Sequence, residues 1–223
     1  MNSIPVTALI VAKAPEPGKA KTRLAATVGD EVAAEVAAAA LLDTLDAMAA
    51  APVAARVVAL TGDLAVASRG AEIRSRLESF IVIGQSGTDF AERLANAHAD
   101  AGVVGESRPV LQIGMDTPQV TAELLAACGR RLLQAEALLG PAYDGGWWIL
   151  GVHDPTDAEC LRGVPMSQPD TGELTAKALR DTGVEVTLVE TLADIDVIDD
   201  VAAVRDACSP ASRFARVTRA HGL

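Results

Sequence analysis

Four positively charged side chains fall within residues 13–23 of the sequence: Lys13, Lys19, Lys21 and Arg23, against the single acid Glu16. Ammonium groups supply point charges and a guanidinium supplies a fork of donors, and both bind phosphate oxygens. The chain as a whole has a formal charge of −11, so this segment reverses the local sign. The spacing predicts a loop that wraps a diphosphate or triphosphate, although a solvated basic loop also accounts for it.

Two prolines stiffen this basic segment, and Gly18 allows backbone to approach a ligand closely. The segment is not the GxxxxGK[ST] phosphate loop, because Lys13 stands at the first glycine position and Ala20 follows Lys19. It is not a GxGxxG dinucleotide motif either. The loop therefore predicts phosphate binding without one of the familiar fingerprints.

Two isolated carboxylates follow apolar runs further along the chain. Asp116 lies in IGMDTP, and Asp144 is followed by Gly145 and Gly146 in PAYDGGWWILG. A carboxylate that faces phosphates usually does so through a metal ion, and Mg²⁺ is held by one or two carboxylates plus phosphate oxygens. Asp116 is thus a candidate ligand for Mg²⁺ or Mn²⁺, the alternative being that it caps the next helix. The two glycines leave room for a ligand or merely form a turn.

A late acidic cluster, ADIDVIDD, contains Asp194, Asp196, Asp199 and Asp200. Acids are favourable at the positive end of a helix, so the cluster predicts the start of the last helix. Asp196 is the member that we expect to reach the site, as a second and weaker metal ligand.

The elements that must position these groups alternate along the chain. Short apolar runs typical of buried strands cover 6–12, 56–62, 80–84, 109–114, 147–152 and 184–190. Helical segments lie between them, near 30–51, 63–77, 89–101, 121–134, 173–182 and 199–208. This order predicts an α/β sandwich. Ligands in such folds bind at the carboxyl ends of the strands, where the basic loop, Gln85, Asp116 and Asp144 all lie. Gln85 joins the predicted nucleotide-binding set.

Composition narrows the partners. With 30 acidic and 19 basic side chains, neither nucleic acid nor an anionic membrane surface is expected as a partner. The three cysteines have no zinc-ligand spacing, and the first apolar run is too short to span a bilayer. We expect one domain over residues 1–223 and a cytoplasmic location. Whether the chain forms a homodimer stays open.

The strings AKAPEPGKAKTRL, QSGTDFAERL, IGMDTP, GPAYDGGWWILGV and the late DID resemble the DUF2064 type of bacterial glycosyltransferase-like protein. That group is similar in architecture to the molybdenum cofactor and 2-phospho-L-lactate guanylyltransferases. The resemblance implies a nucleotide-diphospho-sugar transferase-like (GT-A) fold, a three-layer α/β/α sandwich with a mixed, mostly parallel sheet. It also implies that Asp116 stands at the metal-binding acid and that residues 144–146 line the acceptor side.

The leading functional hypothesis is a glycosyltransferase that uses a nucleotide-diphospho-sugar and a small-molecule acceptor. Lys13, Lys21 and Arg23 would stabilise charge on the leaving diphosphate, and Asp144 would orient or deprotonate the acceptor. The alternative is a nucleotidylyltransferase, guanylyltransferase-like, acting on a small phosphorylated acid. A further alternative is a non-catalytic nucleotide-binding protein.

Overall fold

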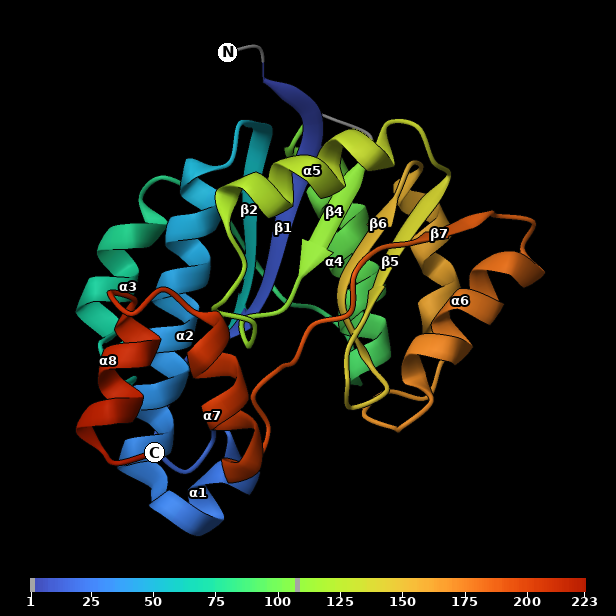
Figure 1. Cartoon of the computed structure of the whole chain (residues 1–223). Helices are drawn as coiled ribbons and strands as arrows, with labels where there is room; N and C mark the ends of the chain where they lie inside the picture. The colour runs from blue at the N-terminus through green and yellow to red at the C-terminus, as the bar shows by residue number, and fades with distance from the viewer. Residues whose placement is uncertain (1–2, 107–108) are drawn as a thin grey trace.

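The computed structural model describes residues 3–106 and 109–223 and contains one mixed seven-stranded sheet between helices (Figure 1). The strands are β1 Ile4–Lys13, β2 Val53–Thr61, β3 Ile81–Gly84, β4 Val110–Ile113, β5 Ala137–Pro141, β6 Trp147–Val152 and β7 Val186–Leu188. The α-helices are α1 Thr22–Val28, α2 Asp30–Ala50, α3 Gly70–Leu77, α4 Phe90–Val104, α5 Ala122–Leu132, α6 Thr171–Asp181, α7 Ile198–Ala207 and α8 Arg213–Ala220, and η1 Pro155–Gly163 is a 3₁₀-helix.

The strand order is β3-β2-β1-β4-β6-β5-β7. All pairings are parallel except those of β6, which runs antiparallel to both β4 and β5. The carboxyl ends of the parallel strands therefore share one edge of the sheet with the start of β6. That edge receives the segments after β1, β4 and β5, where the sequence places its basic and acidic candidates.

Both faces of the sheet are covered, which explains the continuous apolar runs of its strands. The face formed by alternate β1 residues such as Val6 and Ile10 packs against α2, α3 and α5. The opposite β1 residues, Leu9 and Val11, pack with α4, η1 and α6. The three-layer α/β/α architecture expected from the sequence is confirmed.

A third cluster of buried apolar residues lies beside α2, away from the sheet, and joins α1, α7 and α8 to it. Ile195 and Phe214 are its anchors from the end of the chain, exposed by 1% and 0%. Figure 1 shows the orange segment that leaves β7, crosses toward α1 and enters α7. This path returns the late acidic residues to the neighbourhood of the basic loop.

Several predicted boundaries were wrong. The helix expected over 63–77 begins only at Gly70, because Asp63 accepts a hydrogen bond from the Ala65 amide (2.7 Å) and forms a turn instead. The helix expected near 30–51, by contrast, is confirmed as α2, with Gly29 at its N-cap. The short helices α1 and α8 were not predicted. They are amphipathic or Ala-rich segments that take their stability from packing on α2.

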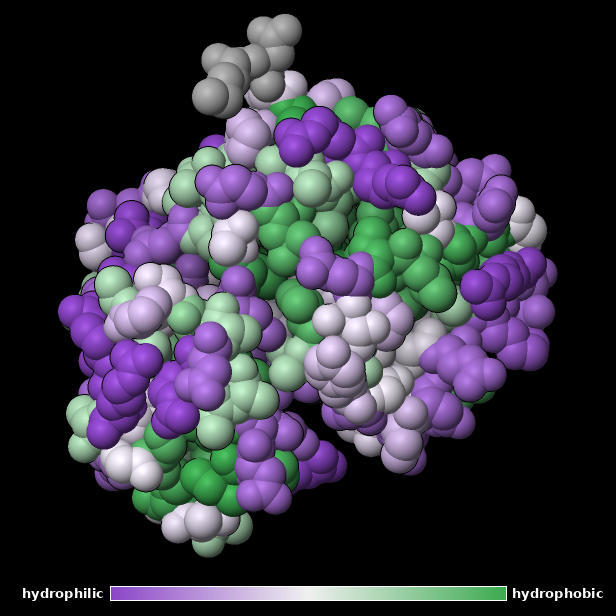
Figure 2. Space-filling model, in the orientation of Figure 1, coloured by the Kyte–Doolittle hydropathy of each residue, from purple (hydrophilic) through white to green (hydrophobic). Residues whose placement is uncertain are grey.

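The face of the molecule in view carries both hydrophilic and hydrophobic residues. Figure 2 shows hydrophilic residues around the rim of one face and hydrophobic residues gathered near its centre. Within the described residues, no helix combines the length and apolar character needed to cross a membrane.

Candidate functional site

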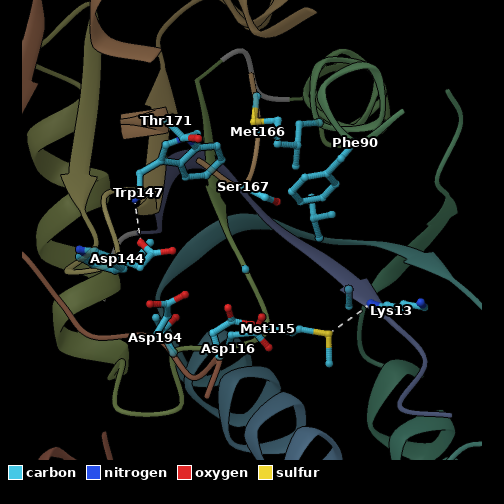
Figure 3. A pocket seen from close by; sticks show the side chains of 18 of the residues that line it. Lys13, Phe90, Met115, Asp116, Asp144, Trp147, Met166, Ser167, Thr171 and Asp194 are labelled. Carbon is cyan, nitrogen blue, oxygen red and sulfur yellow. Dashed lines mark hydrogen bonds between the residues drawn. The ribbon is translucent and has the colours of Figure 1, made fainter. Parts of the chain in front are cut away.

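A cleft of about 670 Å³ opens at the carboxyl edge of the sheet. Its walls come from the ends of β1, β2 and β4, the start of β6, the first turns of α4, and parts of segments 166–171 and 194–196. Figure 3 looks into it: Asp116, Asp144 and Asp194 lie along one side, and Phe90, Met166 and Trp147 lie across from them. The volume is that of a small-molecule site.

Three cations of the basic segment line this cleft: Lys13, Lys21 and Arg23. Lys13 ends β1; its amide faces the Met115 sulfur at 3.3 Å (Figure 3), and its ammonium donates to the Lys19 carbonyl at 2.8 Å. The Lys21 ammonium contacts Asp116 Oδ2 at 2.7 Å and also bonds the Ile195 carbonyl. The strand end and the late segment thus bring residues far apart in sequence to one place.

The other two residues predicted to hold phosphate face elsewhere. Lys19 pairs with Glu16 at 2.7 Å and does not line the main cleft. The hydrogen bond from Lys19 lowers the pKa of Glu16 below its ordinary value. Gly18 has φ +74 and its hydrogen points toward the Asp30 carboxylate, so the loop needs it for its turn. Lys19 instead borders a smaller hollow of about 240 Å³ next to the cleft.

One carboxylate oxygen of Asp116 is paired with a lysine, and the other has no partner among the described residues. Asp116 follows β4, its carbonyl accepts from the Ile195 amide at 3.3 Å, and Oδ2 receives Lys21. Its other oxygen, Oδ1, is buried and has no hydrogen-bond partner among the described residues. Helix capping does not occupy it, because the Thr121 hydroxyl caps α5 by accepting from the Leu124 amide at 3.1 Å. A buried carboxylate oxygen without a donor is expected where a ligand completes the site.

Asp194 faces Asp116 and Asp144 across the acidic side of the cleft (Figure 3). Burial, the largest cause, and the nearby charges of Asp144 and Asp116 raise its pKa, Lys21 lowers it, and the net result is a pKa of about 6. The sequence analysis chose Asp196 from this cluster. Asp194 and Asp196 are two residues apart in a segment that precedes α7, so the sequence alone could not predict which of them faces Asp116.

Asp196 also lines the cleft, but its Oδ2 is bonded to the Arg23 guanidinium. Asp200 accepts from the amides of Asp196 and Val197, at 2.9 and 2.8 Å, at the start of α7. The three acids therefore have different roles. Asp200 caps α7, as predicted for this cluster, Asp196 pairs with Arg23, and Asp194 faces Asp116. Asp194, rather than the predicted Asp196, is therefore the acid of this cluster that faces Asp116.

The Asp144 turn joins β5 to β6. Asp144 Oδ1 accepts from the Gly146 amide at 2.7 Å, and both residues line the cleft. Gly145 does not: it has φ +91, and a Cβ there would lie 1.7 Å from the Pro169 carbonyl oxygen. Gly145 therefore lets segment 165–172 dock against the turn, and the expectation that it leaves room for an acceptor is corrected.

Two glutamines lie at the floor of the cleft. Gln85 was predicted; its Nε2 donates to the carbonyls of Ala12 and Ala59, at 2.7 and 2.9 Å, which fixes the side chain across β1 and β2. Gln112 on β4 was missed, although it is the single polar residue in its apolar run. Its Oε1 is buried and unpartnered among the described residues.

The wall opposite the acids is apolar and aromatic. Phe90 is 49% exposed, and Trp147 and Met166 are half-buried beside it. Arg93, one turn after Phe90, lines the same wall, and its Nε donates to the Gly87 carbonyl at 3.4 Å. Trp148, by contrast, is a core residue whose indole donates to the Glu190 carbonyl at 2.9 Å. This wall suits a base or sugar ring.

Within the described part of the chain, no group of three or more histidine, cysteine, aspartate or glutamate side chains is placed to hold a metal ion by itself. A metal in this cleft would need further ligands from water or from a bound substrate.

Comparison with known proteins gives a family and a fold. The family model described as "Uncharacterized protein conserved in bacteria (DUF2064)" matches residues 44–168, which is more than half of the chain. A "putative nucleotide-diphospho-sugar transferase" from Desulfovibrio desulfuricans G20 is 25% identical, covers 100% of this chain and 96% of its own, and superposes with a TM-score of 0.85. No curated protein matches.

More distant solved structures share the fold alone. The 4-diphosphocytidyl-2C-methyl-D-erythritol synthase from Anaerococcus prevotii is 14% identical over 89% of this chain and 93% of its own, with a TM-score of 0.58. The manganese complex of Rv0371c from Mycobacterium tuberculosis is 19% identical over 89% and 97%, with a TM-score of 0.54. The fold is that of nucleotide-diphospho-sugar transferases and related cytidylyltransferases.

Proposed function

The chain belongs to the DUF2064 family, and we propose that it is a nucleotide-dependent transferase that passes a sugar from a nucleotide-diphospho-sugar to a small-molecule acceptor. One observation carries the proposal. Lys13, Lys21 and Arg23 line the same cleft as Asp116 and the facing acids, although half of the chain separates the two groups.

A divalent metal ion fits this arrangement. Asp116 has a buried Oδ1 without a donor, and Asp194 is a second carboxylate at the same wall. Mg²⁺ binds through one or two carboxylates together with substrate phosphates and water, so two protein ligands suffice. Asp116 and Asp194 would hold Mg²⁺ or Mn²⁺, which would supply positive charge next to the leaving diphosphate. The manganese complex of a protein with this fold is consistent with that assignment.

The chain's own residues account for the other steps. Lys13, Lys21 and Arg23 are placed to bind diphosphate oxygens and to stabilise the charge that develops on them as the sugar leaves. Asp144 has Oδ1 bonded to the Gly146 amide, which leaves Oδ2 to orient an acceptor hydroxyl and take its proton. The aromatic wall with Phe90 and Trp147 would cover the ring of donor or acceptor and exclude water.

Nucleotidylyl transfer to a small phosphorylated acid is the second candidate. A triphosphate would need more positive charge than a diphosphate, and Lys19 is turned away from the main cleft by its pair with Glu16. The adjoining hollow of about 240 Å³, however, is bordered by Lys19 as well as by Lys13, Lys21 and Arg23. That hollow offers a basic position for a terminal phosphate and keeps this candidate open.

Ligand-dependent stabilisation separates the candidates. A ligand at 100 times its dissociation constant raises the free energy of unfolding by about 2.7 kcal/mol, so a melting panel with Mg²⁺ will rank nucleotide-sugars against nucleoside triphosphates. Stabilisation by a nucleotide-sugar, with nucleoside diphosphate released when acceptor is added, supports glycosyl transfer. Stabilisation by a triphosphate with pyrophosphate release supports the second candidate. Stabilisation without turnover across a broad acceptor library indicates a binding protein, and no stabilisation by either class contradicts the proposal.

A further inference from the structure

The Lys21 ammonium lies between two oxygens on the acidic side of the cleft. The ammonium lies 2.7 Å from Asp116 Oδ2 and also bonds the Ile195 carbonyl, and the Lys21 side chain is only 12% exposed. Two oxygens that converge on one buried cation form the kind of ligand set that a hard divalent ion prefers. Lys21 is therefore more than a surface residue that happens to touch an acid.

The backbone conformation of Lys21 and its two acceptors fix the position of the ammonium. Lys21 has φ +47, a left-handed conformation that costs an ordinary residue about 1 kcal/mol or more. Its acceptors are equally fixed: the Ile195 side chain is buried, and the Ile195 amide is bonded to the Asp116 carbonyl at 3.3 Å. The Gln119 amide reinforces the same junction by donating to the Ala193 carbonyl at 2.5 Å.

Arg23, a second cation of the basic segment, is also held by an acid. Arg23 is bonded to Asp196, so two of the three basic-segment cations that line the cleft are paired with carboxylates. A diphosphate must replace those carboxylates as the partner of Lys21 and Arg23. The acids released by this exchange, whose side chains are 32% and 33% exposed, would be left partly buried and unpaired, which is unfavourable unless another cation arrives.

We propose that Lys21 stands in for the divalent metal ion in the ligand-free protein, and that nucleotide binding exchanges it for the metal. Phosphate oxygens draw the ammonium away from Asp116, and the metal takes the vacated position. The exchange makes metal and nucleotide binding mutually dependent, since each ligand alone leaves charges without partners. The inference rests on the proposed function for the identity of the phosphate ligand, but its metal half can be tested without any nucleotide.

The experiment is a titration of free protein with Mn²⁺, followed by the electron paramagnetic resonance signal of the unbound ion at pH 7.5. Lys21→Met removes the ammonium, and we expect Mn²⁺ to bind at least tenfold more tightly than to the wild type. The double variant Lys21→Met with Asp116→Asn should lose that gain. Lys177→Met is the matched control: it removes a lysine from an exposed pair with Asp181 on α6 and changes net charge equally, so it should leave Mn²⁺ affinity unchanged.

Lys21→Asn provides a second variant in case Lys21→Met does not fold, because asparagine tolerates the left-handed backbone. Unchanged or weaker Mn²⁺ binding in the folded Lys21 variants overturns the exchange. A gain that survives Asp116→Asn, or that appears equally in Lys177→Met, overturns it too. The proposed function fails separately: if a Lys21 variant gains Mn²⁺ affinity but the wild type binds no nucleotide, Lys21 still occupies the metal position, whereas the transferase assignment and the nucleotide-driven step are refuted.

Discussion

Two charged clusters tie the end of the chain to its amino-terminal half, and they are built differently. In the first, Arg213 at the start of α8 meets three carboxylates: its Nη1 lies 2.5 Å from Asp46 and 3.3 Å from Asp43, and its Nε lies 2.9 Å from Glu72. Burial lowers the pKa of Arg213, but the bonds to these acids outweigh it and raise the pKa overall. Asp43 also accepts from the Phe214 amide at 2.8 Å.

In the second cluster, around Lys21, the pairing is incomplete. Asp116 Oδ1 has no donor among the described residues, and burial together with Asp144 raises the pKa of Asp194 to about 6. In the Arg213 cluster each acid is bonded to the guanidinium, and these bonds join α8 to α2 and α3. The second keeps unpaired oxygens beside a cleft. The contrast indicates that the Arg213 cluster stabilises the fold, whereas the Lys21 cluster is arranged to exchange partners.

Arg213→Met should break the comparison most severely. It removes the shared partner of three acids. Removal of one member of a fully buried ion pair costs about 3 kcal/mol or more, and here Asp43 is 9% exposed while Asp46 and Glu72 are 36% and 45% exposed, so a cost of about 2 to 3 kcal/mol is expected. We expect a loss of this size in the free energy of unfolding, measured in urea, and no change in nucleotide or Mn²⁺ binding by the folded variant. A loss below 1 kcal/mol, or altered ligand binding, would mean that the two clusters are not functionally separate.

His98 on α4 provides a case outside both charged clusters. It is buried, and neither ring nitrogen is hydrogen-bonded among the described residues. Burial lowers its pKa from 6.5 to about 3, so the folded protein keeps it neutral while the unfolded chain binds a proton below pH 6.5. Stability should therefore fall as the pH decreases through this window, by about 2 kcal/mol between pH 6.5 and 5. His98→Leu should flatten this slope in urea unfolding, whereas His153→Gln, at an exposed site, should leave it intact. Equal slopes for the wild type and His98→Leu contradict this assignment.

Asp116→Asn should change stability by only about 1 kcal/mol, since Lys21 keeps an amide oxygen and the Ile195 carbonyl as acceptors. Its effect should appear instead in ligand binding. We expect the dependence of nucleotide affinity on Mg²⁺ to disappear, as followed by calorimetric titration with and without a chelator. Full metal dependence in this variant would place the metal elsewhere.

Arg23→Ala should have the smallest effect on the empty protein. The Arg23 side chain is 65% exposed, and exposed ion pairs contribute about 0–1 kcal/mol. The same substitution should abolish the increase in melting temperature produced by nucleotide. Arg216→Ala, on α8 and exposed, is the control and should retain that increase. An undiminished nucleotide shift in Arg23→Ala would remove the basic loop from the site.

Sequence patterns predicted six of the seven strands, the main helices that cover the sheet and the loops at the strand ends, because buried strands and Ala-rich helices leave local signatures. They missed β5, a short run that no predicted segment covers. They could not predict which acid of the late cluster faces Asp116. Asp194 and Asp196 differ only in the partner that the fold presents to each, and Arg23 comes from the other end of the chain. Lys19 and Lys21 are both lysines of the same loop, so the sequence could not separate their roles. Only the contact of Lys19 with Glu16 turns its ammonium away from the main cleft. For Gly145 the sequence left open room for a ligand or a turn. The structure shows the turn, because the carbonyl of Pro169, which no local pattern links to it, fills the space.

The most direct test of the account is a crystal of the wild-type protein soaked with a nucleoside diphosphate and Mn²⁺, with anomalous diffraction to locate the metal. The account predicts an anomalous peak beside Asp116 and Asp194, phosphate oxygens in contact with Lys13, Lys21 and Arg23, and the Lys21 ammonium withdrawn from Asp116. A nucleotide bound outside this cleft, or manganese bound away from Asp116, would contradict it.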